Sequence, residues 1–214
     1  MEIKRQGNAQ SSVQSIMLPS RATVLDVYCD MKWNGGGWIV IQRRLNGKVS
    51  FSRNWQQYQE SFGELHGDFW IGLENLHALT SNQAMELRID LINYHNETGY
   101  AEYTTFSVAS VHNFYRLNVG GFTGNVGDAM GDVAFPSRVP NGQRFSTFDE
   151  DNDPSVLSNC ALAKKGGWWY NQCYHCHLNG LFGEAHGDDK HMSWIPWKGN
   201  VGDIKFVEMK IRPV

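Results

Sequence analysis

The sequence predicts an α+β domain built mostly from antiparallel strands, with a long irregular segment in its last third. Strand-like alternation occurs in four separate runs, and helical spacing occurs in two short stretches. Between Gly120 and the final strand both periodicities fade, and Gly, Asp and Asn dominate this segment. Eight Trp and 22 Gly among 214 residues suit a loop-rich fold held by large rigid side chains. A structureless stretch of this length in a compact domain is usually functional.

Four runs have the apolar pattern of β-strands. The first, GGWIVIQRR, follows a glycine turn and places Trp38 and Val40 in a buried strand. The second, MELRIDLIN, alternates apolar and polar residues, as expected of a strand with one buried face. Its apolar positions are Met85, Leu87, Ile89 and Leu91; the third run contains Tyr115, Leu117 and Val119, and the fourth spans residues 206–211.

Two short helices are expected between the first and second strands. In NWQQYQESFG, Trp55, Tyr58 and Phe62 fall at i, i+3 and i+7, which places them on one helical face. Ser52 and Asn54 are candidate N-caps, because their side-chain oxygens can accept hydrogen bonds from the free amides of the first turn. A shorter helix is predicted from about residues 72–74 to 80–82.

The charge composition excludes several classes of partner. The formal net charge is −3 and the pI is near 6.2, so no basic surface for nucleic acid or anionic membrane is indicated. No apolar run approaches the roughly 20 residues that cross a bilayer, so no membrane insertion is expected.

An acidic loop is the strongest candidate for a metal site. Asp149, Asp151 and Asp153 alternate with Glu150 and Asn152. Alternating carboxylates converge only in a turn, and a hard cation such as Ca²⁺ offsets their repulsion. The alternative is a solvated acidic turn that binds nothing.

The loop does not follow the EF-hand pattern. Counting from Asp149, position six is Pro154 where glycine is needed, and position twelve is Cys160 where a bidentate glutamate is needed. Two carboxylates, two backbone carbonyls and waters could form the site instead.

The cysteines allow two interpretations. Cys173 and Cys176 could form a zinc half-site or a redox pair, since His175, His177, His186 and His191 lie nearby in the sequence. The competing interpretation, which we favour, joins Cys160 to Cys173 as a structural disulfide. Closing a loop of this length contributes about 3 kcal/mol in the chain-entropy model.

Several motifs resemble the fibrinogen C-terminal domain family over essentially the whole chain. They include YCDMKWNGGGWIVIQRR, FWIGLENLHALT, LNVGGFTGNVGD, FSTFDEDND, NCA, GGWWYNQC, LNG and VEMKIRP, in this order. The resemblance implies one extracellular domain over 1–214, with a central antiparallel sheet and short helices. Its expected parts are an N-terminal subregion of about 1–45, a central sheet region of 46–135 plus 205–214, and a loop-rich calcium and ligand region of 136–204.

The family's calcium site falls on the side chains of Asp151 and Asp153 and on the backbone carbonyls of Ser155 and Leu157. The family disulfide falls on Cys160 and Cys173, in agreement with the loop argument. The resemblance also implies a cis peptide bond between Gln172 and Cys173. A non-proline cis bond costs about 3 kcal/mol, so the surroundings must enforce it.

The ligand-binding residues expected from the resemblance depart from those of the acetyl-binding lectins. Lys164 stands where those lectins carry Tyr, and Tyr174 stands where they carry His. A tyrosine or phenylalanine followed by alanine becomes Asp188-Asp189, and a later Tyr becomes Asn200. These changes favour a charged or hydroxyl-rich ligand over an N-acetyl group; the alternative is solvated loop charges without a ligand. The full expected set is Lys164, Gln172, Cys173, Tyr174, Asp188, Asp189 and Asn200.

Other positions carry separate expectations. The family pairs the cysteine at Cys29 with an upstream one, but residues 1–28 contain none, and Cys176 has no family partner. A bond between Cys29 and Cys176 is disfavoured, because the family layout places them far apart. Asn96 begins an Asn-Glu-Thr triplet, an N-glycosylation acceptor in a secreted chain.

The sequence predicts a binding domain and not an enzyme. It contains no Gly-x-Ser-x-Gly, His-Glu-x-x-His or phosphate-loop motif. The expected function is calcium-dependent, lectin-like recognition of carbohydrate or microbial surfaces in innate immunity. Oligomerisation through regions outside this chain would raise its affinity. The alternative is an adhesion or signalling module that binds a protein receptor or matrix partner, as in tenascins and angiopoietins.

Overall fold

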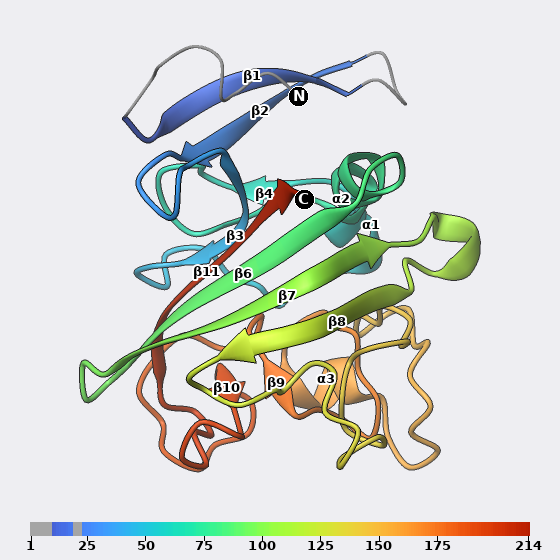
Figure 1. The fold of residues 1–214 in the computed structure, drawn as a ribbon. Helices are drawn as coiled ribbons and strands as arrows, with labels where there is room; N and C mark the ends of the chain where they lie inside the picture. Colours follow the sequence, from blue (N-terminus) through green and yellow to red (C-terminus); the bar gives the residue numbers. More distant parts are fainter. Residues whose placement is uncertain (1–9, 19–22) are drawn as a thin grey trace.

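A large antiparallel sheet organises the chain (Figure 1). The structure is a computed structural model that describes residues 10–18 and 23–214. The main path of the sheet runs in the order β1-β2-β3-β11-β6-β7-β8, and the short strands β4 and β5 pair beside β3. The strands are β1 (Ser12–Leu18), β2 (Thr23–Asp30), β3 (Trp38–Arg44), β4 (Phe62–Gly63), β5 (Phe69–Trp70), β6 (Met85–Asn93), β7 (Thr98–Val108), β8 (Leu117–Gly124) and β11 (Ile204–Pro213).

The final strand of the chain, β11, lies at the centre of the sheet between β3 and β6. Its apolar residues pair with those of β6, so that Met209 lies opposite Ile89 and Ile211 opposite Leu87. All four of these side chains are buried. The strands predicted from GGWIVIQRR, MELRIDLIN and the C-terminal run are therefore confirmed, and the α+β class with them.

The third predicted strand begins later than expected. Tyr115 precedes β8 and adopts a left-handed conformation with φ of 50°, while its ring is buried. The sequence also failed to indicate β1, β2 and β7. In β7 the buried positions are occupied by Gly, Ala, Tyr, Phe and Val, separated by Thr, Ser and Glu, so the apolar signal is diluted.

The predicted helices are confirmed in position but are short. Helix α1 (Trp55–Gln59) begins at the N-cap Asn54 and not at Ser52. The Asn54 side chain accepts a hydrogen bond from the Gln57 amide. The helix ends before Phe62, which lies in β4. Helix α2 (Leu73–Thr80) matches the expectation, whereas the short α3 (Cys160–Lys164) was not predicted. Within the described residues, we find no helix with the length and apolar character needed to cross a membrane.

The loops that follow β8 gather below the sheet together with α3, β9 (Cys176–His177) and β10 (Ser193–Trp194) (Figure 1). Buried polar side chains of β3 hold this segment. The Arg44 guanidinium donates to the carbonyls of Leu178 at 3.1 Å and Gly180 at 2.8 Å, and Gln42 donates to Leu178 at 3.0 Å. Burial lowers the pKa of Arg44 to about 10, and the group lies 3.9 Å above the Phe51 ring.

We expect Arg44→Lys to destabilise the protein although it keeps the positive charge. Both carbonyls accept from Arg44 Nη1, and the lysine side chain ends one bond short of that atom, so its ammonium would not reach them. A buried charge that loses such partners is costly. The free energy of unfolding should fall by about 2–4 kcal/mol in urea titrations. Arg144→Lys is the matched control, because Arg144 is exposed and stacks on Phe114. A loss no larger than the control's would contradict the role given to Arg44.

Candidate functional site

The acidic loop folds around the carboxylate of Asp153. One of its oxygens accepts from the Ser155 amide and the other from the Cys160 amide, both at 2.9 Å. The Asp151 carboxylate in turn accepts from the Asp153 amide at 3.3 Å. Both predicted calcium side chains therefore lie in one tight turn that ends at α3.

The electrostatics of this turn favour a cation. Burial, and to a smaller extent the neighbouring charge of Asp151, raise the pKa of Asp153 to about 6, against the lowering effect of its two amide hydrogen bonds. Both effects disfavour the second negative charge, and a divalent ion coordinated by oxygen would relieve both. Each carboxylate oxygen of Asp153 keeps a second lone pair beyond its amide hydrogen bond, so the donor set fits Ca²⁺.

Asp149 has a different role from the other two aspartates. Its carboxylate accepts from the Trp55 amide at 3.0 Å and from the Thr147 hydroxyl at 2.8 Å. It therefore fastens the start of the loop to the first turn of α1. Spacing alone could not separate Asp149 from Asp151 and Asp153.

The other two predicted calcium residues follow Asp153 around the turn. The side chains of Val156 and Leu157 are 95% and 93% exposed, so this part of the loop faces solvent. The assignment of the Ser155 and Leu157 carbonyls as ligands stays a prediction.

The predicted disulfide is present and joins Cys160 to Cys173, with a Cα–Cα distance of 5.5 Å. The zinc half-site interpretation of Cys173 and Cys176 is wrong, because Cys173 is already bonded and burial raises the pKa of the Cys176 thiol well above its usual range. Cys29 is also a buried free thiol, whose pKa burial raises to about 11.

The expected cis bond before Cys173 is also wrong: the peptide between Gln172 and Cys173 is trans. The backbone amides on either side of this peptide form hydrogen bonds in the trans form. The Asn171 amide donates to the Cys173 carbonyl at 2.7 Å, and the Gln172 amide donates to the Ser137 carbonyl at 2.9 Å. The trans backbone avoids the cost of about 3 kcal/mol that a cis bond carries.

Three of the predicted ligand-binding residues meet on the surface beside α3. The Lys164 ammonium forms an ion pair with the Asp189 carboxylate and lies 5.9 Å from the centre of the Tyr174 ring. The Tyr174 hydroxyl donates to the Asp189 carbonyl at 3.0 Å. An ion pair therefore lies at the surface next to the ring of Tyr174.

The other predicted ligand residues lie apart from this group in their contacts. Asp188 accepts from the Lys190 amide at 3.0 Å and approaches the His191 ring at 3.4 Å. Asn200 is buried and exchanges backbone contacts with Trp194. Gln172 is exposed in the turn before Cys173. The structure therefore brings together Lys164, Tyr174 and Asp189. Asp188 precedes Asp189 and its charge acts on Tyr174, but its own hydrogen bond and ion pair go to Lys190 and His191.

The histidines that the sequence suggested as zinc ligands do not act together. His175 and His177 are buried, and the Nε2 of His177 lies 2.7 Å from the Tyr170 hydroxyl. His186 lies instead against His95 and Asp203. No sequence motif indicates this group, because its members are far apart in the chain.

Comparison with known proteins identifies relatives for the whole chain. The profile of the family described as fibrinogen beta and gamma chains, C-terminal globular domain, matches residues 1–214. Chicken tenascin is 45% identical over 97% of this chain and 11% of its own length. Human angiopoietin-related protein 7 is also 45% identical, over 88% of this chain and 53% of its own length. The chain thus spans between about a tenth and a half of these curated relatives.

Solved structures show the same fold. The fibrinogen-like globe domain of human ANGPTL2 has a TM-score of 0.89 and 36% identity, covering 97% of this chain and 94% of that one. A lamprey fibrin D-dimer in complex with the peptide Gly-His-Arg-Pro-amide has a TM-score of 0.90 and 33% identity, covering 99% of this chain and 72% of that one.

We expect His177 to make stability depend on pH. Burial lowers the pKa of His177 from 6.5 to about 3 in the folded protein. The unfolded chain therefore takes up a proton that the folded protein does not, so this contribution to stability is complete above pH 6.5 and is lost as the pH falls towards about 3. Urea midpoints measured from pH 7 to about pH 4 should fall more steeply for the unsubstituted chain than for His177→Gln.

The slope with pH is the quantity to compare, because His177→Gln also changes a buried contact. His112→Gln serves as the control, since His112 is exposed and its replacement should leave the slope unchanged. Equal slopes for His177→Gln and the unsubstituted chain would refute the expectation.

Proposed function

Because this chain belongs to the fibrinogen C-terminal domain family, we propose that it is an extracellular recognition module that binds a protein partner through the loops of residues 136–204. Fibrinogen-related domains of this kind are non-enzymatic modules, which confirms the prediction that the chain is not an enzyme. The tenascin and angiopoietin-related relatives are secreted, so the predicted extracellular location is confirmed as well.

The relatives favour adhesion or signalling over the lectin function that the sequence analysis placed first. Tenascins and an angiopoietin-related protein are among the similar curated proteins, and they point to matrix and signalling roles. The expectation of glycan recognition in innate immunity therefore gives way to the alternative, a module that binds a protein receptor or matrix partner.

The observation that carries this proposal is the ion pair between Lys164 and Asp189 above the Tyr174 ring. An N-acetyl group gains affinity when its methyl sheds water against apolar walls. Here that position holds an ion pair, and an acetyl group offers its two charges nothing to replace the water that they would lose. A protein partner can compensate for this loss, because its own charged side chains can pair with Lys164 and with Asp189.

One structural neighbour supports a peptide ligand for this fold. The lamprey fibrin D-dimer, 33% identical to this chain over the aligned region, is described in complex with the peptide Gly-His-Arg-Pro-amide. We extend from this that the loops of the present chain bind an exposed segment of a protein. The identity of that protein depends on the rest of the polypeptide as well.

Calcium is the proposed cofactor, held by the side chains of Asp151 and Asp153 and by the carbonyls of Ser155 and Leu157. When bound, the ion would neutralise the acidic turn and order the loop that leads to α3. Asn96 is the proposed glycosylation site: it is exposed at the turn between β6 and β7, where its side-chain oxygen accepts from the Lys205 ammonium at 2.9 Å.

We expect calcium to raise the melting temperature. At a concentration about 100-fold above its dissociation constant, a ligand selective for the folded state contributes about 2.7 kcal/mol. For a domain of this size that corresponds to about 5–10 °C, measurable by differential scanning calorimetry with calcium or with chelator. Asp151→Asn and Asp153→Asn should each reduce the shift, and the double variant should abolish it.

Glu150→Gln is the control for loop charge, because Glu150 lies in the same loop but is not a proposed ligand. Its calcium shift should equal that of the unsubstituted chain. A full shift in the double aspartate variant would place the ion elsewhere.

The proposed function is tested by cell adhesion to surfaces coated with the 214-residue chain. Cells should attach, and brief protease treatment of the cells should prevent attachment, since the partner is a protein. Removal of cell-surface glycans should have little effect. Lys164→Ala combined with Asp189→Ala should reduce attachment by about 10-fold or more, as expected when a central charged contact is lost.

The matched control removes another exposed ion pair, Lys198 with Glu97, and should attach normally. A glycan array run with and without chelator gives the opposing outcome. Calcium-dependent binding to a defined glycan, with adhesion that survives protease, would restore the lectin function and refute this proposal.

A further inference from the structure

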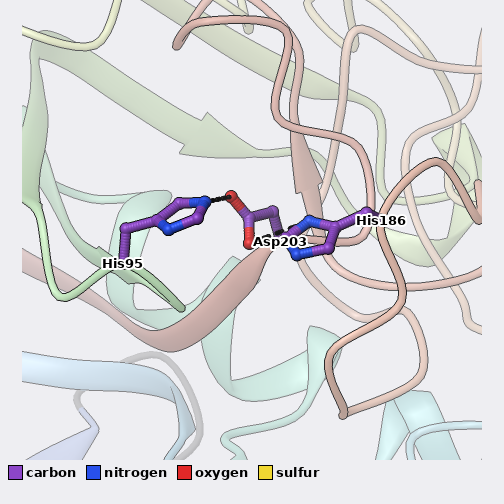
Figure 2. A group of neighbouring side chains, drawn as sticks. All are labelled: His95, His186 and Asp203. Carbon is purple, nitrogen blue, oxygen red and sulfur yellow. Dashed lines mark ion pairs between the residues drawn. The ribbon is translucent and has the colours of Figure 1, made fainter.

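Two histidines and a buried aspartate from three separate segments meet beside the turn between β6 and β7 (Figure 2). His95 lies in that turn, His186 lies in the loop between β9 and β10, and Asp203 directly precedes β11. Figure 2 shows the Asp203 carboxylate between the two rings, with an ion pair to each. His186 Nδ1 lies 3.3 Å from one carboxylate oxygen, and His95 Nε2 lies 3.8 Å from the other.

These spacings suit the ligands of a tetrahedral metal ion. Zinc binds imidazole nitrogen and carboxylate oxygen at about 2.0–2.2 Å, so two ligand atoms at a tetrahedral angle lie about 3.3–3.6 Å apart. One ligand atom from each of the three residues can be chosen so that all lie within 4.8 Å of one another. Metal binding would draw His95 closer to the other two ligands, and its side chain, which is 66% exposed, has room to move.

Backbone hydrogen bonds hold the three residues in place. The Tyr94 amide donates to the Asp203 carbonyl at 3.1 Å, which fixes the residue next to His95. The Ala185 amide donates to the Gly202 carbonyl at 3.0 Å, which fixes the residue next to His186. Gly202 makes this approach possible: its φ is 68°, and a Cβ there would lie 2.1 Å from the Ala185 carbonyl oxygen.

Within the described part of the chain, one polar atom of the cluster is buried without a hydrogen-bond partner. The Asp203 side chain is only 7% exposed, and its Oδ1, which faces His186, has no hydrogen-bond partner among the described residues. On the other side of the same ring, His186 Nε2 lies 3.0 Å from the Glu184 carboxylate. A neutral His186 that donates to Glu184 presents a lone pair to the lone pairs of Asp203, which is repulsive unless a cation lies between them.

The contact with Glu184 has the form of an outer shell. Histidines that bind metals usually donate their second ring N–H to a carboxylate, which orients the ring and fixes its tautomer. Glu184 does this for His186, and the nitrogen left free is the one that faces Asp203. The nearby ammonium groups are engaged elsewhere, since Lys198 pairs with Glu97 and Lys205 donates to Asn96.

We propose that His95, His186 and Asp203 bind a zinc ion, with Glu184 as the outer-shell partner of His186. Two imidazoles and one carboxylate provide three ligands and leave a fourth position for water or for a group from a partner. Nitrogen ligands favour zinc over calcium, so this site is chemically distinct from the acidic turn of Asp151 and Asp153. The site joins the β6–β7 turn to the C-terminal loops and does not depend on the proposed partner.

The test is calorimetric titration of the 214-residue chain with zinc chloride in calcium-containing buffer. One saturable site is expected. His95→Ala and His186→Ala should each weaken zinc binding by more than the roughly 10- to 100-fold typical of a lost outer-shell partner, and Glu184→Ala should weaken it within that range. Both histidines are more than half exposed, so these variants should fold, which thermal melts without metal will verify.

His112→Ala is the matched control, because His112 is exposed and lies outside the cluster. Cobalt(II) substitution adds a spectroscopic readout: visible bands of a tetrahedral ion without thiolate charge transfer are expected, and they should vanish in His186→Ala. The proposal is overturned if the unsubstituted chain shows no saturable zinc binding, or if both histidine variants bind as tightly as His112→Ala. The alternative, a protonated His186 held by two carboxylates, predicts the first of these outcomes.

Discussion

The buried contact between the Arg44 guanidinium and the carbonyls of Leu178 and Gly180 is the constraint on which the loop region depends. The segment after β8 contains little regular structure, so few of its backbone groups can be satisfied by a sheet or a long helix. A fixed charge beneath it supplies donors at two points. The same contact requires the loops to return to one place, since a buried guanidinium without its carbonyls would be strongly unfavourable.

The two halves of the fold are specified in different ways. The sheet is held by apolar side chains that tolerate exchange for others of similar size. The loops are held by individual polar contacts and by glycines that permit close backbone approach. Gly166 is an example: a Cβ there would lie 2.2 Å from the Asn179 carbonyl oxygen, and no other residue avoids that clash.

Sequence reasoning succeeded where a single local pattern determined the outcome. Period-two alternation located β6, the Asn54 cap located α1, and loop length favoured the disulfide between Cys160 and Cys173. It failed where the outcome depended on distant contacts. Strand β7 is diluted by threonine and glycine, and its pairing with β6 and β8 gives it order.

The candidate sites show the same limit. Sequence spacing does not distinguish the three aspartates of the acidic loop. The hydrogen bonds from the Trp55 amide and the Thr147 hydroxyl separate Asp149 from the other two. The resemblance implied a cis bond at Gln172 that the hydrogen bonds of the turn do not require. His95 and Asp203 carry no local signal, because backbone hydrogen bonds between three remote segments create their proximity.

The bond between Asp149 and the Trp55 amide also gives the acidic loop a route into the core. The Trp55 ring packs against Tyr115 and Phe145, while the Trp55 amide donates to Asp149 in the loop. If the loop opens, the first turn of α1 loses a partner for one of its free amides and frays. The exchange rate of this one amide proton would then report the order of a surface loop from a position inside the helix, which makes Trp55 a built-in sensor for the state of the loop.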